Sequence, residues 1–251
     1  MGRASAAKKN KKSAGSYTRK KVINWFPIVV SGITVAVVAM LAVLTVFMNQ
    51  LSREPAQAPQ SNVTVAADIA TTIVQETGAI RIGEASDTLE EYADFGCSHC
   101  LAYHQQFGEL VKGAVADEKI TLEIYPVAFM DNAYVGSQFS TRGANALYCV
   151  ASEAPNSIFE FQAAVYANKP EDGKAGPELA SFVKIAENVG ASAAASCILN
   201  ETYNDFVKER SQAINRFPWF TGTPTLRWNE NVVTPESIPM ELQRIVDAPA
   251  S

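Results

Sequence analysis

The segment Phe95-Gly96-Cys97-Ser98-His99-Cys100 is the most informative part of this 251-residue chain. Residues 88–95 alternate apolar and polar side chains and predict a strand, and residues 101–111 predict a helix. A Cys-x-x-Cys at this junction puts the first sulfur at the helix N-terminus, where unpaired N–H groups and the helix dipole stabilise a thiolate. Because the thiolate is the reactive form of cysteine, we expect Cys97 to be the nucleophile and Cys100 its disulfide partner.

The first 48 residues divide into a basic tail and an uncharged segment. Residues 1–25 contain eight Lys or Arg and no Asp or Glu, and residues 26–48 contain no charged side chain. At about 1.5 Å per residue the uncharged segment spans roughly 34 Å, which is enough to cross a bilayer core of about 30 Å. The basic flank predicts a cytoplasmic N-terminus in the cell membrane and places the rest of the chain outside the cytoplasm.

A cleaved signal peptide is the alternative to this transmembrane anchor. The apolar part of a signal peptide is usually about 7–15 residues, shorter than residues 26–48. Ala56-Gln57-Ala58 resembles a cleavage site, but Pro59 is expected to obstruct cleavage. We therefore expect an uncleaved signal anchor with a single membrane pass.

The part of the chain after the basic tail is acidic. Without the eight basic residues of the tail, 13 of the 21 Lys and Arg remain against 26 Asp and Glu, a net charge of −13. Such an acidic outer part argues against binding to nucleic acid or to an anionic membrane surface.

The remaining chain predicts a linker and one domain. Residues 49–77 are assigned to the linker, because 53–60 are rich in Pro and Gln and lack large apolar side chains. Residues 78–251 are enough for one domain with a core. Its expected strands are 79–82, 88–95, 120–127, 225–228 and 232–233, with a helical block at about 132–216 and a last helix at 238–246.

Four cysteines are compatible with disulfides outside the cytoplasm. Four cysteines allow three pairings, and the sequence alone does not choose among them. The chemistry expected of Cys97 and Cys100 leaves Cys149 and Cys197 as the natural structural bridge. Both lie in apolar, helix-like surroundings, which predicts burial and low reactivity.

A second motif, Thr221-Gly222-Thr223-Pro224-Thr225, opens the next-to-last strand. Together with the Cys-x-x-Cys after the second strand, it resembles the thioredoxin superfamily, and more narrowly the membrane-anchored bacterial DsbA-type oxidoreductases. The resemblance covers about 79–246 and implies an α/β thioredoxin-like fold with a helical insertion. It also implies a cis bond before Pro224 and a Thr223 backbone edge that binds an extended peptide. An ordinary trans proline at the start of a strand is the alternative.

Two side chains near the cysteines have expected roles. His99 is expected to stabilise the Cys97 thiolate, the alternative being an exposed surface histidine. Ser98 stands where the family often has proline, which leaves the reaction class unchanged and the redox potential open.

A strand carboxylate completes the expected catalytic set. Glu91 occupies the position where the family tends to have a buried acid, and we expect it to relay protons to and from Cys100. A solvated strand residue is the alternative. Glu90 and Asp94 have the other strand parity, which predicts that both lie on the opposite face.

No metal site or cofactor is expected besides the redox-active disulfide. Zinc usually needs three or four protein ligands, and the only histidines are His99 and His104. A c-type haem needs histidine where Leu101 stands. Copper bound by Cys97, Cys100 and His104 is the weaker alternative.

These observations predict an extracytoplasmic thiol–disulfide oxidoreductase that donates the Cys97–Cys100 disulfide to exported polypeptides with reduced cysteines. The resemblance further implies a membrane quinone reductase of the DsbB or VKOR type as the partner that reoxidises it. Two alternatives remain open: a disulfide reductase or isomerase of the same fold, and a copper metallochaperone.

Overall fold

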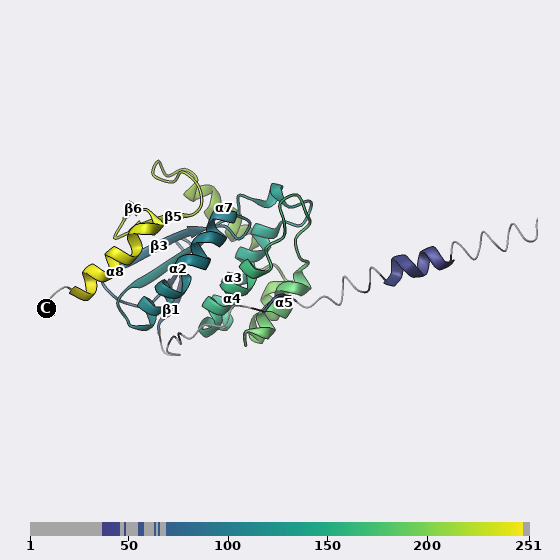
Figure 1. The fold of residues 1–251 in the computed structure, drawn as a ribbon, viewed down its shortest axis with the longest axis horizontal. Coiled ribbons are helices and arrows are strands. Elements are labelled where there is room, and N and C mark those ends of the chain that lie inside the picture. Colours follow the sequence, from purple (N-terminus) through teal and green to yellow (C-terminus); the bar gives the residue numbers. More distant parts are fainter. Residues whose placement is uncertain are drawn as a thin grey trace, which may run out of the picture. The chain divides into compact units, whose positions relative to one another are not determined.

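Strands of the C-terminal part form one mixed sheet in the computed structural model, which describes residues 37–45, 48, 55–57, 63, 65 and 69–247. The order across the sheet is β1-β2-β4-β3-β5-β6 (Figure 1). The β3–β4 pair is parallel, and the other neighbouring pairs are antiparallel. The strands are β1 (Thr71–Val74), β2 (Ala79–Ile82), β3 (Thr88–Ala93), β4 (Thr121–Pro126), β5 (Thr225–Trp228) and β6 (Asn231–Val233).

Helix α2 (Ser98–Ala116) is the crossover between the parallel strands β3 and β4, which cannot be joined by a short turn. It buries one face at helical spacing, with Cys100, Tyr103, Phe107 and Val111 shielded from solvent. These side chains belong to the same core as Leu89 of β3. The second cysteine, Cys100, is therefore buried in the core that α2 shares with the sheet.

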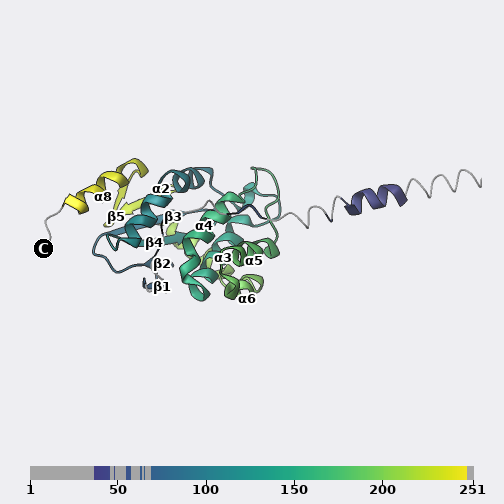
Figure 2. The same ribbon diagram turned by 60° about the horizontal axis from the view of Figure 1, so that its bottom comes forward.

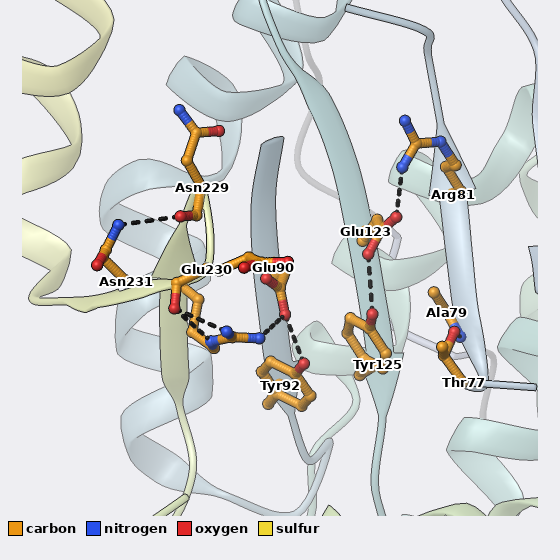
Figure 3. Close-up of polar contacts among 11 residues, drawn as sticks. Thr77, Ala79, Arg81, Glu90, Tyr92, Glu123, Tyr125, Asn229, Glu230 and Asn231 are labelled. Atoms are coloured by element: carbon orange, nitrogen blue, oxygen red, sulfur yellow. Dashed lines mark hydrogen bonds and ion pairs between the residues drawn. The ribbon is translucent and has the colours of Figure 1, made fainter. Parts of the chain in front are cut away.

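The other face of the sheet has a smaller core and a row of charges. The rings of Tyr92 and Tyr125, register partners on β3 and β4, stack with centroids 4.2 Å apart. Glu90 and Glu123 are also register partners, and each pairs with an arginine of the next strand outward. Figure 3 shows both carboxylates accepting a bond from a nearby tyrosine.

A helical block joins β4 to β5, as expected for residues from about 132 to 216. Figures 1 and 2 show α3, α4 and α5 gathered at the right of the strands and α8 at the left. Ile238 and Leu242 of α8 belong to the same core as the buried face of α2. Most of α3 is buried, which makes it the centre of the block. The helices are α3 (Phe139–Glu153), α4 (Ile158–Ala167), α5 (Leu179–Asn188), α6 (Ala195–Leu199), α7 (Asn204–Ile214) and α8 (Ile238–Asp247), with 3-10 turns at Asp131–Ala133, Pro155–Ser157, Ser192–Ala194 and Pro235–Ser237.

The linker expected at 49–77 needs one correction. Residues Thr71–Val74 form the edge strand β1, which pairs with β2. Gly78, with φ +83°, provides the left-handed conformation in the connection between the two strands. The strand is short and only half-buried, so its apolar pattern is weak in the sequence.

The expected basic tail and transmembrane segment lie largely outside the described residues. Residues 37–45 are helical, and the rest of 1–48 is not described apart from residue 48. Among the described residues, no helix has the length and apolar character needed to cross a membrane. Residues 1–53 and 54–251 form two separate units.

Candidate active site

The turn between β3 and α2 presents the two cysteines, and glycine is required in it. Cys97 is the N-cap residue of α2, and its N–H donates to the Asp94 carbonyl at 3.0 Å. A Cβ on Gly96 would lie 2.6 Å from the Ser140 hydroxyl and 2.7 Å from the Tyr134 ring. Any larger residue would therefore displace the turn or its neighbours.

Cys97 and Cys100 are both free thiols in very different environments. Cys97 is 7% exposed and lines a cleft, whereas Cys100 is fully buried. A hydrogen bond from Cys100, followed by the contacts with Thr223 and the N–H groups of Cys100 and His99, lowers the pKa of Cys97 to about 5 against the effect of burial. Burial, and then the neighbouring Cys97, raises the pKa of Cys100. Only Cys97 is a thiolate at neutral pH.

The Thr223–Pro224 peptide bond is cis and faces this thiol. The Cys97 sulfur lies 3.2 Å from the Thr223 carbonyl oxygen, to which the protonated thiol can donate a hydrogen bond. The two sequence motifs, separated by more than 120 residues, therefore meet at the reactive sulfur.

A cleft of about 590 Å³ opens over Cys97. Phe129, on the loop after β4, and Phe220, before the cis proline, face each other there with ring centroids 5.6 Å apart. Its polar lining includes Asp172 from the helical block. The cleft therefore combines an apolar wall, the backbone edge at Thr223 and the reactive sulfur.

The segment before the cis proline is held against the sheet by a stack of side chains. The rings of Phe217 and Trp219 are parallel, with centroids 5.0 Å apart. The Arg227 guanidinium lies 4.5 Å from the centroid of the Trp219 ring, a cation–π contact. Arg227 itself is paired with Glu90, so the cleft edge is tied to the polar row of the sheet.

Glu91 is buried beneath the cysteines, on the face of the sheet that packs against α2. Gln162 of α4 donates a hydrogen bond to its carboxylate at 2.9 Å. Burial raises the pKa of Glu91 to about 7, against the lowering effects of Gln162 and Tyr103. Tyr103 also interacts with Cys100, so the carboxyl and the buried thiol share a neighbour.

The His99 side chain is exposed at the rim of the cleft. Its contribution to the Cys97 thiolate in this structure comes from its backbone N–H. The imidazole is available to a substrate bound in the cleft, and its role in stabilising the thiolate stays a prediction.

Asp94 differs from its expected position. It follows the last residue of β3, where strand parity no longer applies, and it turns into the active site instead of the opposite face. Its carboxylate is fully buried and accepts hydrogen bonds from the N–H groups of Gly96, Phe129 and Met130. Glu90 does lie on the opposite face, as expected.

Cys149 of α3 and Cys197 of α6 form a disulfide that links two helices of the block. Cys149 is fully buried, and Cys197 packs at the margin of the same core. Neither residue lines the cleft over Cys97. The placement is that of a structural bridge.

Among the described residues, no group of three or more His, Cys, Asp or Glu side chains is arranged to hold a metal ion. His104 packs its ring against Tyr166, with centroids 5.0 Å apart. Burial lowers the pKa of His104 to about 4, so this histidine is neutral near pH 7.

A dithiol at the N-terminus of the helix after a central strand, opposite a cis proline, defines the thioredoxin-like class of proteins. The family model described as thioredoxin matches residues 76–248, and the chain belongs to this family. The predicted α/β fold is thereby confirmed.

Two solved structures of thiol–disulfide exchange proteins are similar to this chain. The reduced DsbA of Mycobacterium tuberculosis is 26% identical, with a TM-score of 0.59 over 68% of this chain and 93% of that one. The MdbA protein of Corynebacterium matruchotii, described as a thiol-disulfide oxidoreductase, is 18% identical, with a TM-score of 0.61 over 72% of this chain and 93% of that one. This second likeness shows the fold alone.

A curated relative shares the domain in another context. The serine/threonine-protein kinase PknE of Mycobacterium tuberculosis is 24% identical over 172 residues, which are 64% of this chain. The match spans 30% of that relative's length. The likeness therefore concerns one part of a much longer protein.

The stability difference between the reduced and oxidised proteins is expected to depend on pH. The low pKa of Cys97, about 5, stabilises the folded reduced protein. This stabilisation is complete at a pH above the pKa of an unfolded cysteine, and it decreases as the pH falls toward 5. The oxidised protein has no such thiol. Denaturant unfolding of both forms is expected to show the difference growing by about 1.4 kcal/mol per pH unit between roughly pH 5 and 8.5. A difference that is flat with pH would contradict the assigned thiolate.

Proposed function

We propose that this protein is a membrane-anchored, extracytoplasmic thiol–disulfide oxidoreductase that donates the Cys97–Cys100 disulfide to exported proteins. The observation that carries the proposal is the contrast between the two thiols: Cys97, with a pKa of about 5, faces the cleft, and Cys100 is buried with a raised pKa. This asymmetry supports Cys97 as the sulfur that meets the substrate.

The reaction begins with the oxidised protein. A substrate thiolate attacks the Cys97 sulfur, a mixed disulfide forms, and Cys100 leaves as a thiolate that takes up a proton. A second substrate thiolate attacks the substrate sulfur of the mixed disulfide and releases Cys97 as a thiolate. The substrate loses two electrons and two protons in total: Cys100 keeps one proton, and the other goes to solvent because Cys97 stays a thiolate at pH 7. The Thr223 edge orients the substrate while Pro224 keeps that edge beside Cys97.

The stabilised thiolate supports transfer in the direction of disulfide donation. A pKa of about 5 favours the reduced protein at pH 7 by about 2.7 kcal/mol over a cysteine with the ordinary value of about 8.5. For a two-electron couple this corresponds to roughly 60 mV toward a more oxidising potential. This shift supports disulfide donation over disulfide reduction.

Glu91 is proposed to exchange protons with Cys100 when Cys100 leaves. Its pKa of about 7 gives comparable amounts of acid and base at neutral pH, which suits proton transfer. Without a donor, the Cys100 thiolate would remain unneutralised in a buried site.

Glu91→Gln tests this role with opposite effects on rate and stability. We expect reduction of the oxidised protein by a substrate dithiol to slow about a hundredfold, as is typical when a general acid is lost. At pH 8 the variant should be more stable by up to about 3 kcal/mol, because a buried carboxylate is replaced by a neutral amide. Stopped-flow kinetics and denaturant unfolding measure the two effects, and an unchanged rate argues against proton transfer by Glu91.

The cell location of the proposal rests on the sequence and the second disulfide. The basic segment 1–25 followed by the uncharged segment 26–48 favours an anchor with the domain outside the cytoplasm. The Cys149–Cys197 bridge is expected in an oxidising compartment. Reoxidation then requires a membrane quinone reductase of the DsbB or VKOR type, a partner suggested by the family.

Equilibration of residues 54–251 with glutathione is the decisive experiment. The fraction of Cys97–Cys100 disulfide, measured by mass spectrometry at fixed ratios of reduced to oxidised glutathione, gives the potential. We expect a couple more oxidising than glutathione, together with rapid oxidation of a reduced test protein. A strongly reducing couple would instead favour a reductase or isomerase, and metal analysis of the reduced domain tests the copper alternative.

A further inference from the structure

Asp94 is a buried charge for which the proposed reaction has no use. It lies between the end of β3 and Gly96, with no exposed surface. No ion pair with Lys, Arg or His is found for it among the described residues, whereas Glu90 of β3 pairs with Arg227. A buried carboxylate without a cation must be stabilised by hydrogen bonds.

The backbone provides these hydrogen bonds from two separate segments. One carboxylate oxygen accepts the N–H of Gly96 at 2.7 Å, and the other accepts the N–H groups of Phe129 at 2.6 Å and Met130 at 3.0 Å. The backbone N–H of Asp94 faces the Cys100 sulfur at 3.5 Å. A single residue thus ties the cysteine turn to the loop that follows β4.

That loop forms one wall of the cleft. Phe129 and Met130 both line it, and the Phe129 ring is 37% exposed while it faces Phe220. The distance from this wall to Cys97 therefore depends on the hydrogen bonds that the Asp94 carboxylate accepts. An asparagine could keep only part of them, because one of its two terminal atoms is a donor.

The ionised carboxylate is the form that suits this arrangement. Burial raises the pKa of Asp94 to about 6, against the lowering effects of Ser140 and the three backbone N–H groups. Hydrogen bonds to an ionised acceptor are stronger than neutral ones, so three of them hold the two segments firmly.

We propose that Asp94 is a positioning residue that fixes the Phe129–Met130 wall relative to Cys97 and thereby sets the affinity of the cleft for peptide substrates. The inference rests on the proposed thiol–disulfide exchange. A peptide extends from the sulfur along the wall, whereas a small thiol needs only the sulfur. Loss of the positioning therefore affects peptides selectively.

Asp94→Asn in the oxidised protein tests this selectivity. Two reductants are compared by single-turnover kinetics: dithiothreitol, and a short dithiol peptide with apolar residues beside its cysteines. For the peptide we expect the half-saturating concentration to rise about tenfold, equivalent to about 1.4 kcal/mol, with little change in the limiting rate. The rate constant with dithiothreitol should change less than about twofold. Glu123→Gln is the matched control, since it makes the same acid-to-amide change on the opposite face of the sheet.

A second measurement covers the case in which Asp94→Asn does not fold. In the wild-type protein, NMR should show slow hydrogen exchange for the amides of Gly96, Phe129 and Met130. Rapid exchange of these amides overturns the inference, and so does an equal loss with both reductants or a Glu123→Gln variant that behaves like Asp94→Asn. A wild-type protein that reacts with neither thiol refutes the proposed function and this inference together. If the wild-type protein reacts and Asp94→Asn has the same half-saturating peptide concentration as the wild type, this inference alone is refuted.

Discussion

Replacing Cys100 with serine is expected to turn the protein into a trap for its substrates. Loss of the hydrogen bond from Cys100 is expected to raise the pKa of Cys97 above about 5, but the backbone N–H groups of residues 99 and 100 still favour its thiolate. This thiolate can attack a substrate disulfide and form a mixed disulfide, releasing one substrate thiolate. No second protein thiol is then available to resolve the complex. Non-reducing electrophoresis and mass spectrometry should detect adducts on Cys97 that dithiothreitol removes.

The converse variant, Cys97→Ser, is expected to form no adducts. Cys100 is fully buried and its pKa is raised. Each pKa unit above the ambient pH lowers the thiolate fraction about tenfold, so alkylation of Cys100 at pH 7 should be at least about a hundredfold slower than that of Cys97. Similar alkylation rates for the two single variants at mildly acidic pH would contradict the assignment of Cys97 as the attacking thiol and Cys100 as the buried one.

Removal of the second disulfide should reduce stability without removing activity. The Cys149–Cys197 bridge closes a loop of 48 residues, for which the chain-entropy model gives roughly 4 kcal/mol. For a domain of this size, the double variant Cys149→Ala, Cys197→Ala should melt roughly 10 °C lower. Calorimetry measures this shift, and oxidation of a reduced test protein well below the melting temperature should proceed at a near-normal rate.

A matched control separates the cross-link from simple loss of packing. Val150→Ala removes fully buried side-chain atoms next to Cys149 and leaves the bridge intact. It should cost less than the double cysteine variant. Loss of activity with full retention of stability in the double variant would instead mean that the second pair relays electrons to the first.

The parts of the fold that follow a local pattern were predictable from the sequence. Residues 225–228 match β5 as predicted, because β-branched and aromatic side chains mark a short buried strand. The predicted helix 101–111 is shorter than α2 at both ends, since its first turn overlaps the cysteine motif. Helix α3 is predictable only as part of a helical block, because no capping side chain marks its first residue.

Site features set by tertiary contacts were not predictable. Gln162 reaches Glu91 from a helix of the block that is far away in sequence. Strand parity placed Asp94 on the wrong face because β3 ends one residue earlier. The need for glycine at position 96 arises from Ser140 and Tyr134, which pack against it only in the folded protein.

The stack of Phe217, Trp219 and Arg227 supplies an intrinsic optical probe. The chain has three tryptophans, and two of them, Trp219 and Trp228, lie within residues 54–251. Trp219 lies four residues before Thr223, and its ring contacts both the Phe217 ring and the Arg227 guanidinium. In the Trp228→Phe variant, Trp219 is the single tryptophan of residues 54–251. Because indole emission responds to nearby charge and solvent, the fluorescence of this variant should report peptide docking without an attached dye.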